Sequence, residues 1–161
     1  MTKVGSIERV TQNRVVKLFQ KELDYTYLGD WQERENNSNI EEELLSNYLT
    51  RKGYSKVQVS RAIFELKNTA NNFNDSLYTT NKNVYKQLRY GVKVKADASS
   101  HFETVQLINW KKFKDNDFAI AEEVTIKGNK TKRPDIVIYI NGIALGVIEL
   151  KRSTVTINDG I

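Results

Sequence analysis

The sequence predicts an α/β (α+β) fold in which helices come first and a mainly antiparallel or mixed central sheet follows. In residues 1–90, apolar residues recur at many spacings of three or four, as on one face of a helix. From Gly91 the spacing changes to two, which is typical of strands. Asn141-Gly142 stands between two apolar runs, and this is the strongest short signal for a β-hairpin. The 161 residues suffice for a single domain over residues 1–161 with a real core.

Composition excludes several classes of protein. The chain has no Cys, so it has neither a disulfide framework nor a thiolate metal site. No apolar run approaches the roughly 20 residues that cross a bilayer, and the N-terminus lacks the apolar core of a signal peptide, so a cytoplasmic protein is expected. The formal net charge of +5 favours approach to phosphate. The single histidine, His101, argues against Ser–His–Asp or Cys–His chemistry.

Four helices are expected in residues 1–90. The first covers 7–23 with Ser6 as its N-cap. The second follows a loop at 35–39, is capped by Asn39 and ends near Lys52. The third covers 56–72, and a weaker fourth runs over 74–90, where the TTNKN run at 79–83 is a possible break. The expected apolar face of the first helix comprises Val10, Val15, Leu18, Phe19 and Leu23.

Strands are expected after Gly91. They cover 92–96, 103–110 and 118–127, with a charged loop at 111–117 and a basic turn at 127–133. The hairpin at 134–151 follows. Because both faces of both of its strands are apolar, the hairpin is expected to be central in the sheet and covered on both sides.

Three ionisable residues, Asp135, Glu149 and Lys151, lie in this most apolar part of the chain. Charges in such a setting are costly unless they are paired or bind a metal. Two carboxylates without His or Cys suit Mg²⁺ or Mn²⁺, and such an ion binds a phosphate oxygen and acidifies a water. Lys151 would orient or deprotonate that water, or stabilise the charge that develops on phosphorus. The set predicts hydrolysis of a phosphodiester.

The connection between the two strands decides whether the acids meet. A two-residue turn at Asn141-Gly142 places Asp135 opposite Ile148, with Glu149 on the other face. A three-residue connection that includes Ile143 places Asp135 opposite Glu149, with their Cβ atoms about 5 Å apart. We therefore predict either a three-residue connection with a bulge or a bulge within a strand.

Basic residues flank the two acids in sequence. They either contact DNA phosphates or form a solvated charged turn. The residues assigned to DNA contact are Lys130, Lys132, Arg133 and Arg152.

The residues Pro134-Asp135 and Glu149-Leu150-Lys151 resemble the PD-(D/E)xK nuclease motif. The wider stretch RPDIVIYINGIALGVIELK closely resembles the N-terminal nuclease domain of the restriction (R) subunit of type I restriction–modification enzymes. Residues 11–31, 35–54 and 116–128 are similar to that family as well. Nearly the whole chain is covered by the resemblance.

The resemblance implies a restriction-endonuclease-like core and cleavage of double-stranded DNA in the restriction of foreign DNA. It implies that Asp135 and Glu149 are metal ligands together with the carbonyl of Leu150, and that Lys151 is the catalytic lysine. Many members add an acid from the first helix, for which Glu8 and Glu22 are candidates that no motif distinguishes.

The family's R subunit continues into two ATP-driven translocase domains and works with methyltransferase and specificity subunits. No G-x-x-x-x-G-K-[ST] loop occurs in this chain, so ATP binding is expected only in a full-length subunit. The chain ends at Ile161, before a Gln-x-x-x-Tyr helix that the family often carries, which indicates truncation at the C-terminus.

Two other interpretations remain open at this point. In the first, the chain is a subunit-docking or DNA-binding module that is catalytically silent as a fragment. In the second, it is a basic α/β domain without catalysis. The second requires that Asp135, Glu149 and Lys151 do not converge.

Overall fold

The computed structural model describes residues 6–95, 99, 101–127 and 131–150, with the backbone alone for residues 6–8. The chain forms two compact units. Unit 1 comprises residues 1–39, 117–140 and 144–161, and unit 2 comprises residues 40–116 and 141–143. The expectation of one domain over residues 1–161 stays a prediction beside this division.

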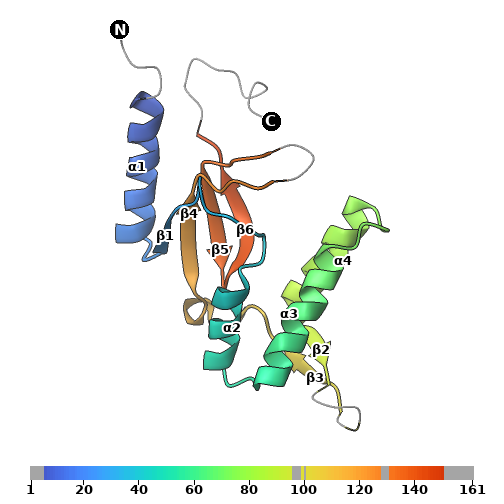
Figure 1. The fold of residues 1–161 in the computed structure, drawn as a ribbon. Helices are drawn as coiled ribbons and strands as arrows, with labels where there is room; N and C mark the ends of the chain where they lie inside the picture. Colours follow the sequence, from blue (N-terminus) through green and yellow to red (C-terminus); the bar gives the residue numbers. More distant parts are fainter. Residues whose placement is uncertain (1–5, 96–98, 100, 128–130, 151–161) are drawn as a thin grey trace. The chain divides into compact units, whose positions relative to one another are not determined.

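Unit 1 consists of one helix and a mixed sheet, as the sequence predicts (Figure 1). The strand order is β1-β4-β5-β6, with β1 parallel to β4 and β4 antiparallel to β5. Strand β1 was not predicted, because its sequence, TYLGD, does not alternate apolar and polar residues. The elements are α1 (Ser6–Lys21), β1 (Thr26–Asp30), β4 (Phe118–Glu122), β5 (Ile136–Ile140) and β6 (Ile143–Ile148).

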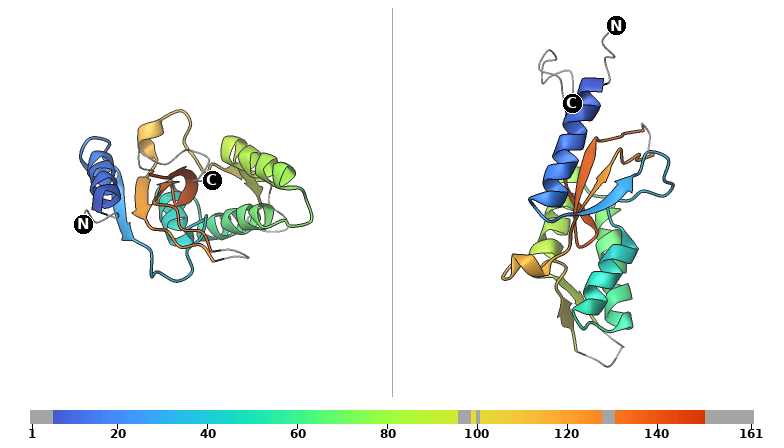
Figure 2. Two further views of the ribbon diagram at one scale, coloured as in Figure 1. Left: turned by 90° about the horizontal axis from the view of Figure 1, so that it is seen from above. Right: turned by 90° about the vertical axis from the view of Figure 1, so that its left-hand side faces the viewer.

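Helix α1 packs beside the sheet, next to β1 (Figure 2). Its position was predicted, but its apolar face was only partly right. Val10, Leu18 and Leu23 are about half exposed, whereas Val16 and Phe19 are buried. The error arose because a polar residue, Gln12, belongs to the buried face and interrupts the apolar spacing.

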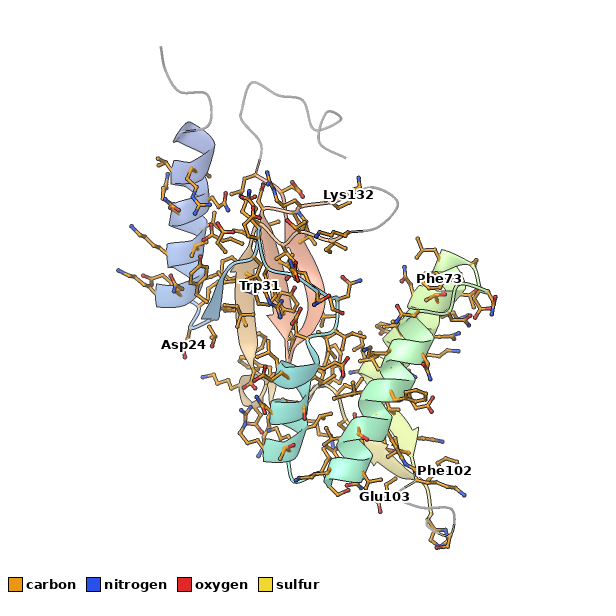
Figure 3. The ribbon with its side chains drawn as sticks, in the orientation of Figure 1. Asp24, Trp31, Phe73, Phe102, Glu103 and Lys132 are labelled. Carbon is orange, nitrogen blue, oxygen red and sulfur yellow. The ribbon has the colours of Figure 1, made fainter. Side chains whose placement is uncertain are left out.

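Each face of the sheet has its own apolar cluster. Because side chains alternate along a strand, neighbouring residues of β4 and β5 serve opposite faces. The α1 face holds Val16, Phe19, Ile120 and Ile136, with Ile138 and Ile148 packed against them. The opposite face holds Trp31, Ala119, Ala121, Val124, Val137 and Tyr139, with Ala144 packed against them (Trp31 is labelled in Figure 3).

Only one of the two strands of the hairpin is central in the sheet. Strand β5 is largely buried, as predicted. Strand β6 is an edge strand of the described sheet, and Val147 on it is 59% exposed, so the expectation that both strands are covered on both faces was wrong. Apolar composition did not distinguish a central strand from an edge strand whose outer side chains face solvent.

Unit 2 contains the other helices and a short two-stranded sheet (Figure 1). Its core is one continuous apolar cluster that includes Leu45, Leu49, Leu66, Val105 and Leu107. Strands β2 and β3 are antiparallel and shorter than predicted. The elements are α2 (Glu42–Arg51), α3 (Lys56–Ala70), α4 (Leu77–Tyr90), β2 (Val92–Val94), β3 (Glu103–Val105) and the 3₁₀ turn η1 (Phe113–Asp115).

Capping explains where the helices of unit 2 begin. Ser55 and Gln58 form a capping box at α3, and Ser76 caps α4 by accepting a hydrogen bond from the backbone of Thr79. With this cap the TTNKN run does not break α4. Helix α2 has Glu41 at its N-cap, although the Glu41 side chain makes no capping hydrogen bond, so the predicted Asn39 cap was wrong.

A set of buried amides, here called the amide network, lies in unit 2. Asn141 Nδ2 donates to the Leu107 carbonyl at 2.8 Å and to Asn116 Oδ1 at 2.9 Å. Asn116 Oδ1 also accepts from the Tyr48 hydroxyl and from the Asn109 backbone, while its Nδ2 donates to the Asn109 and Phe113 carbonyls. Both the oxygen and the nitrogen of the Asn116 side-chain amide are therefore fully used in hydrogen bonds.

No helix among the described residues is long and apolar enough to cross a membrane.

Candidate active site

The turn of the hairpin has two residues, Asn141 and Gly142, with φ angles of 52° and 82°. Two successive positive φ angles are the mark of a type I′ turn, for which Asn-Gly is the preferred pair. The three-residue connection that would have included Ile143 was therefore wrong, because Ile143 already belongs to β6.

The faces of the sheet on which the side chains of β6 lie indicate the second predicted arrangement, a bulge within a strand. Near the turn, Ala144 packs against the cluster that contains Tyr139, on the face that a regular two-residue hairpin requires. A methyl group placed on Gly146 would lie only 3.5 Å from Cβ of Ile138, and Ile148 packs on the same face as Ile136 and Ile138. The register has thus moved by one residue between Ala144 and Gly146, which is the effect of a bulge.

This shift brings Asp135 level with Glu149. The Asp135 carboxylate accepts a hydrogen bond at 2.6 Å, through Oδ2, from the backbone of Leu150, which is the residue after Glu149. The other oxygen, Oδ1, has no hydrogen-bond partner among the described residues. Asp135 is partly buried and Glu149 is exposed.

A second group of polar side chains, here called the charged network, lies at the same end of β4 and β5. Glu122 is only 3% exposed, and its carboxylate accepts hydrogen bonds from Tyr27 Oη at 2.7 Å and from Gln12 Nε2 at 2.8 Å. Arg9 forms an ion pair with it at 3.2 Å. Three donors around a buried carboxylate compensate for the loss of water.

The charged network also holds the backbone of Asp135. Gln12 Nε2 lies 3.4 Å from the Asp135 carbonyl, and the Glu123 backbone N–H donates to the same carbonyl at 3.0 Å. Glu123 has a φ of 50°, an uncommon conformation for a residue other than glycine. Its carboxylate accepts from Gln12 at 3.1 Å and pairs with Arg133 at 3.1 Å. These bonds fix the strained segment directly beside Asp135.

The position of Tyr27 changes its acidity. Burial raises the pKa of the Tyr27 hydroxyl to about 12, and the hydrogen bond to the Glu122 carboxylate adds to the effect. A phenolate at this position would lie against a carboxylate, so the neutral phenol is the form that the fold stabilises.

Gln12, Glu122 and Glu123 were not identified from the sequence. One signal was present for two of them. Gln12 stands four positions before Val16 on the buried face of α1, and Glu122 stands two positions after Ile120 on the buried face of β4. A polar residue at a core position of each element indicates a buried pair, but only the three-dimensional packing shows that they meet.

Several predicted residues lie outside the described part of the chain. These are Lys151, Lys130 and Arg152, and the side chain of Glu8 is not described either. Lys132 and Arg133 are exposed, and Figure 3 labels Lys132 on the segment that leads into β5. Arg133 is engaged by Glu123.

The candidate metal donors near Asp135 are all oxygen atoms. The described residues contain no group of three or more acidic, His or Cys side chains that could hold a metal. Asp135 and Glu149 supply two carboxylates, and the Leu150 carbonyl lies between Glu149 and Lys151 in the chain. Oxygen donors with room for waters are the ligands that Mg²⁺ prefers, so this set fits Mg²⁺ rather than Zn²⁺.

Comparison with known proteins identifies the family. Residues 7–161 match the family model described as type I restriction enzyme R protein N terminus. The HindI endonuclease subunit, a type I restriction enzyme of Haemophilus influenzae, is 33% identical over 47% of this chain and 8% of its own length. The putative type I restriction enzyme MjaVIIP endonuclease subunit of Methanocaldococcus jannaschii is 40% identical over 40% of this chain and 6% of its own length.

No solved structure matches the chain significantly. The chain spans less than a tenth of the length of the curated relatives it matches. The family match, by contrast, extends over nearly all of it, from the first turn of α1 through the hairpin. The chain belongs to the family of type I restriction enzyme R protein N termini.

Proposed function

We propose that this chain is the endonuclease part of a type I restriction enzyme R subunit and that it hydrolyses phosphodiesters of double-stranded DNA with Mg²⁺ or Mn²⁺. One observation carries the proposal: the carboxylate of Asp135 accepts the backbone N–H of Leu150, the middle residue of Glu149-Leu150-Lys151. This bond joins the two halves of the motif across 15 positions of sequence. In the described part of the chain, the second oxygen of Asp135 has no hydrogen-bond partner and so is available as a ligand.

Each residue has a role in this proposal. Asp135, Glu149 and the Leu150 carbonyl hold the ion, which supplies a Lewis acid for a phosphate oxygen and a more acidic water. Lys151 orients the attacking water or stabilises negative charge on the phosphate. Gln12 and Glu123 are positioning residues, because both hold the Asp135 carbonyl.

Basic residues around the hairpin are proposed to contact DNA. Lys132 is exposed, and its backbone pairs with that of Ile126. Lys130 and Arg152 complete the proposed set. Arg133 is the weakest candidate of the four, since Glu123 already neutralises it.

Plasmid cleavage tests the proposal. The full-length R subunit, assembled with methyltransferase and specificity subunits and supplied with ATP and Mg²⁺, is mixed with supercoiled plasmid. We expect cleavage by the wild type and a loss of at least about 100-fold for Asp135→Ala and Lys151→Ala, as for removal of a catalytic group. Matched controls are Glu33→Ala and Lys17→Ala, which change exposed residues of unit 1 and should cleave as the wild type does.

The same assay separates the proposal from a docking function. Assembly of each variant is measured by size-exclusion chromatography. Loss of cleavage with retained assembly supports the nuclease. Unchanged cleavage by Asp135→Ala would contradict it and leave the chain as a docking module.

A further inference from the structure

A cavity of about 710 Å³ lies within unit 2, between the end of α4, the end of α2 and the segment after β3. This volume is within the usual range for small-molecule sites, about 300–1,000 Å³. Aromatic and apolar side chains make up much of its wall. They are Tyr48, Tyr54, Tyr90, Ile108 and Trp110.

Two of these rings are presented to solvent. Tyr90 is 68% exposed and Trp110 is 50% exposed, although both are large apolar surfaces. The Trp110 indole is fixed rather than free, because its Nε1 donates to the Leu88 carbonyl at 2.8 Å. A ring that is held in place and left exposed is suited to stacking with a ligand.

The charges at this cavity have one sign. Its lining includes Lys52, Arg89 and Lys111 and contains no acidic side chain. Lys52 is paired with Asp115 at 3.3 Å, so part of its charge is already used. Arg89 and Lys111 have no ion-pair partner among the described residues. The Arg89 guanidinium lies over the Trp110 ring in a cation–π contact, 5.3 Å from the ring centre. The cavity therefore offers two available cations beside a stacking surface.

A ligand that satisfies both features has a flat aromatic group and a negative charge a few ångströms away. We propose that this cavity of unit 2 binds a single nucleotide unit, with the base stacked on Trp110 and Tyr90 and the phosphate held by Arg89 and Lys111. A base pair inside a duplex cannot reach the rings, since its faces are covered by neighbouring pairs. The nucleotide must come from an unpaired strand or be a free nucleotide. This site is separate from the metal site and does not rest on it.

Fluorescence anisotropy of the 161-residue chain with a labelled thymine oligomer tests the proposal. We expect saturable binding of the single strand, and a slope of log affinity on log salt near about −1.4, from about 0.7 for each of two cations. Trp110→Ala should weaken binding about tenfold, as for the loss of one stacked base. Arg89→Ala and Lys111→Ala should each weaken it and reduce the slope by about 0.7.

The chain offers a neighbouring control for each variant. Lys112→Ala, Lys86→Ala and Phe113→Ala remove exposed side chains of the same kinds that do not line the cavity. They should bind as the wild type does. Circular dichroism of every variant checks that the fold is kept. Quenching of Trp110 fluorescence by the unlabelled oligomer localises the contact, since the other tryptophan, Trp31, is buried in unit 1.

Competition distinguishes the two sources of the nucleotide. Thymidine monophosphate is added as competitor. If it displaces the oligomer at a concentration close to that of the oligomer, counted per nucleotide, the site is assigned to free nucleotides. If it displaces the oligomer much more weakly, the site is assigned to an unpaired strand. Equal binding of the same sequence as a duplex would overturn the proposal, because charge attraction alone would explain it. Equal loss in the Lys111→Ala and Lys112→Ala variants would overturn it as well.

Discussion

The amide network of unit 2 and the charged network of unit 1 solve the same problem with different chemistry. Each satisfies a polar residue that is almost fully buried, Asn141 in one and Glu122 in the other. The amide network contains no formal charge, and Asn116 uses both its donors and its acceptor. The charged network contains two acids, Glu122 and Glu123, and two arginines, Arg9 and Arg133.

The two networks also differ in the backbone strain and the unpaired hydrogen-bond acceptors beside them. The turn that the amide network holds has φ angles that Asn and Gly adopt readily. The charged network instead holds Glu123 at a positive φ beside Asp135, whose Oδ1 lacks a partner among the described residues. Full satisfaction is what stability requires, whereas local strain and an available acceptor are typical of a site that binds something. This difference favours a structural role for the first network and a functional role for the second.

The largest effect should come from breaking the amide network. Asn116→Ala removes its side-chain bonds and leaves buried donors and acceptors unpaired, so we expect a loss of about 3 kcal/mol in the free energy of unfolding. Urea unfolding followed by circular dichroism measures it. Asn81→Ala, at an exposed position of α4, should change stability by less than about 0.5 kcal/mol. A similar small change for Asn116→Ala would contradict the structural role.

Neutralising Glu122 in the charged network should lower the free energy of unfolding by less than Asn116→Ala does. Glu122→Gln keeps the shape but replaces one acceptor by a donor that faces Gln12, Tyr27 and Arg9, so we expect a loss of about 2 kcal/mol in stability. The same unfolding experiment measures it, with Glu33→Gln as the exposed control. If Glu122→Gln were as stable as the wild type, Glu122 would not be the charged centre described above.

The smallest effect is a pH dependence that only the charged network should show. The pKa of Tyr27 is about 12 in the folded chain, against an ordinary tyrosine value of 10.0 once the chain unfolds. The folded state therefore holds this proton more tightly, and the resulting stability is complete below about pH 10 and is lost as the pH rises towards about 12. The stability difference between wild type and Tyr27→Phe should shrink from about pH 9.5 to about pH 11.5.

Urea unfolding at the two pH values measures this change. Tyr78→Phe, at an exposed position of α4, is the control and should show no such trend. A difference between wild type and Tyr27→Phe that stays constant over this range would contradict the hydrogen bond to Glu122.

The sequence predicted the parts of the fold that depend on local order. The four helices, the mixed sheet and the Asn-Gly hairpin all have signals within a few neighbouring residues. Strand β1 was missed because its partner, β4, lies about ninety residues later in the chain and supplies the parallel pairing that stabilises it. The edge position of β6 was missed for the same reason, since the order of strands is not a local property.

For the candidate site, the sequence predicted a register shift within the hairpin but not where the shift occurs. The metal-binding role of Asp135 and Glu149 stays a prediction. The register shift between Ala144 and Gly146 is recognised from the contact of Gly146 with Ile138 and from the packing of Ile148, which no periodicity encodes. The contribution of Gln12 and Glu122 depends on α1 meeting β4, again across more than a hundred residues. Long-range contacts of this kind are the part that sequence patterns do not reach.

The central claim is that Asp135 and Glu149 share one divalent ion. Binding of Mn²⁺ to the 161-residue chain, followed by the electron paramagnetic resonance signal of the free ion, tests it without any cleavage. We expect wild-type binding to weaken at least about tenfold in Asp135→Asn and again in Glu149→Gln, as for disruption of a metal site, while Glu33→Gln binds normally. Affinity that is unchanged in both variants, with the fold intact, would contradict the claim.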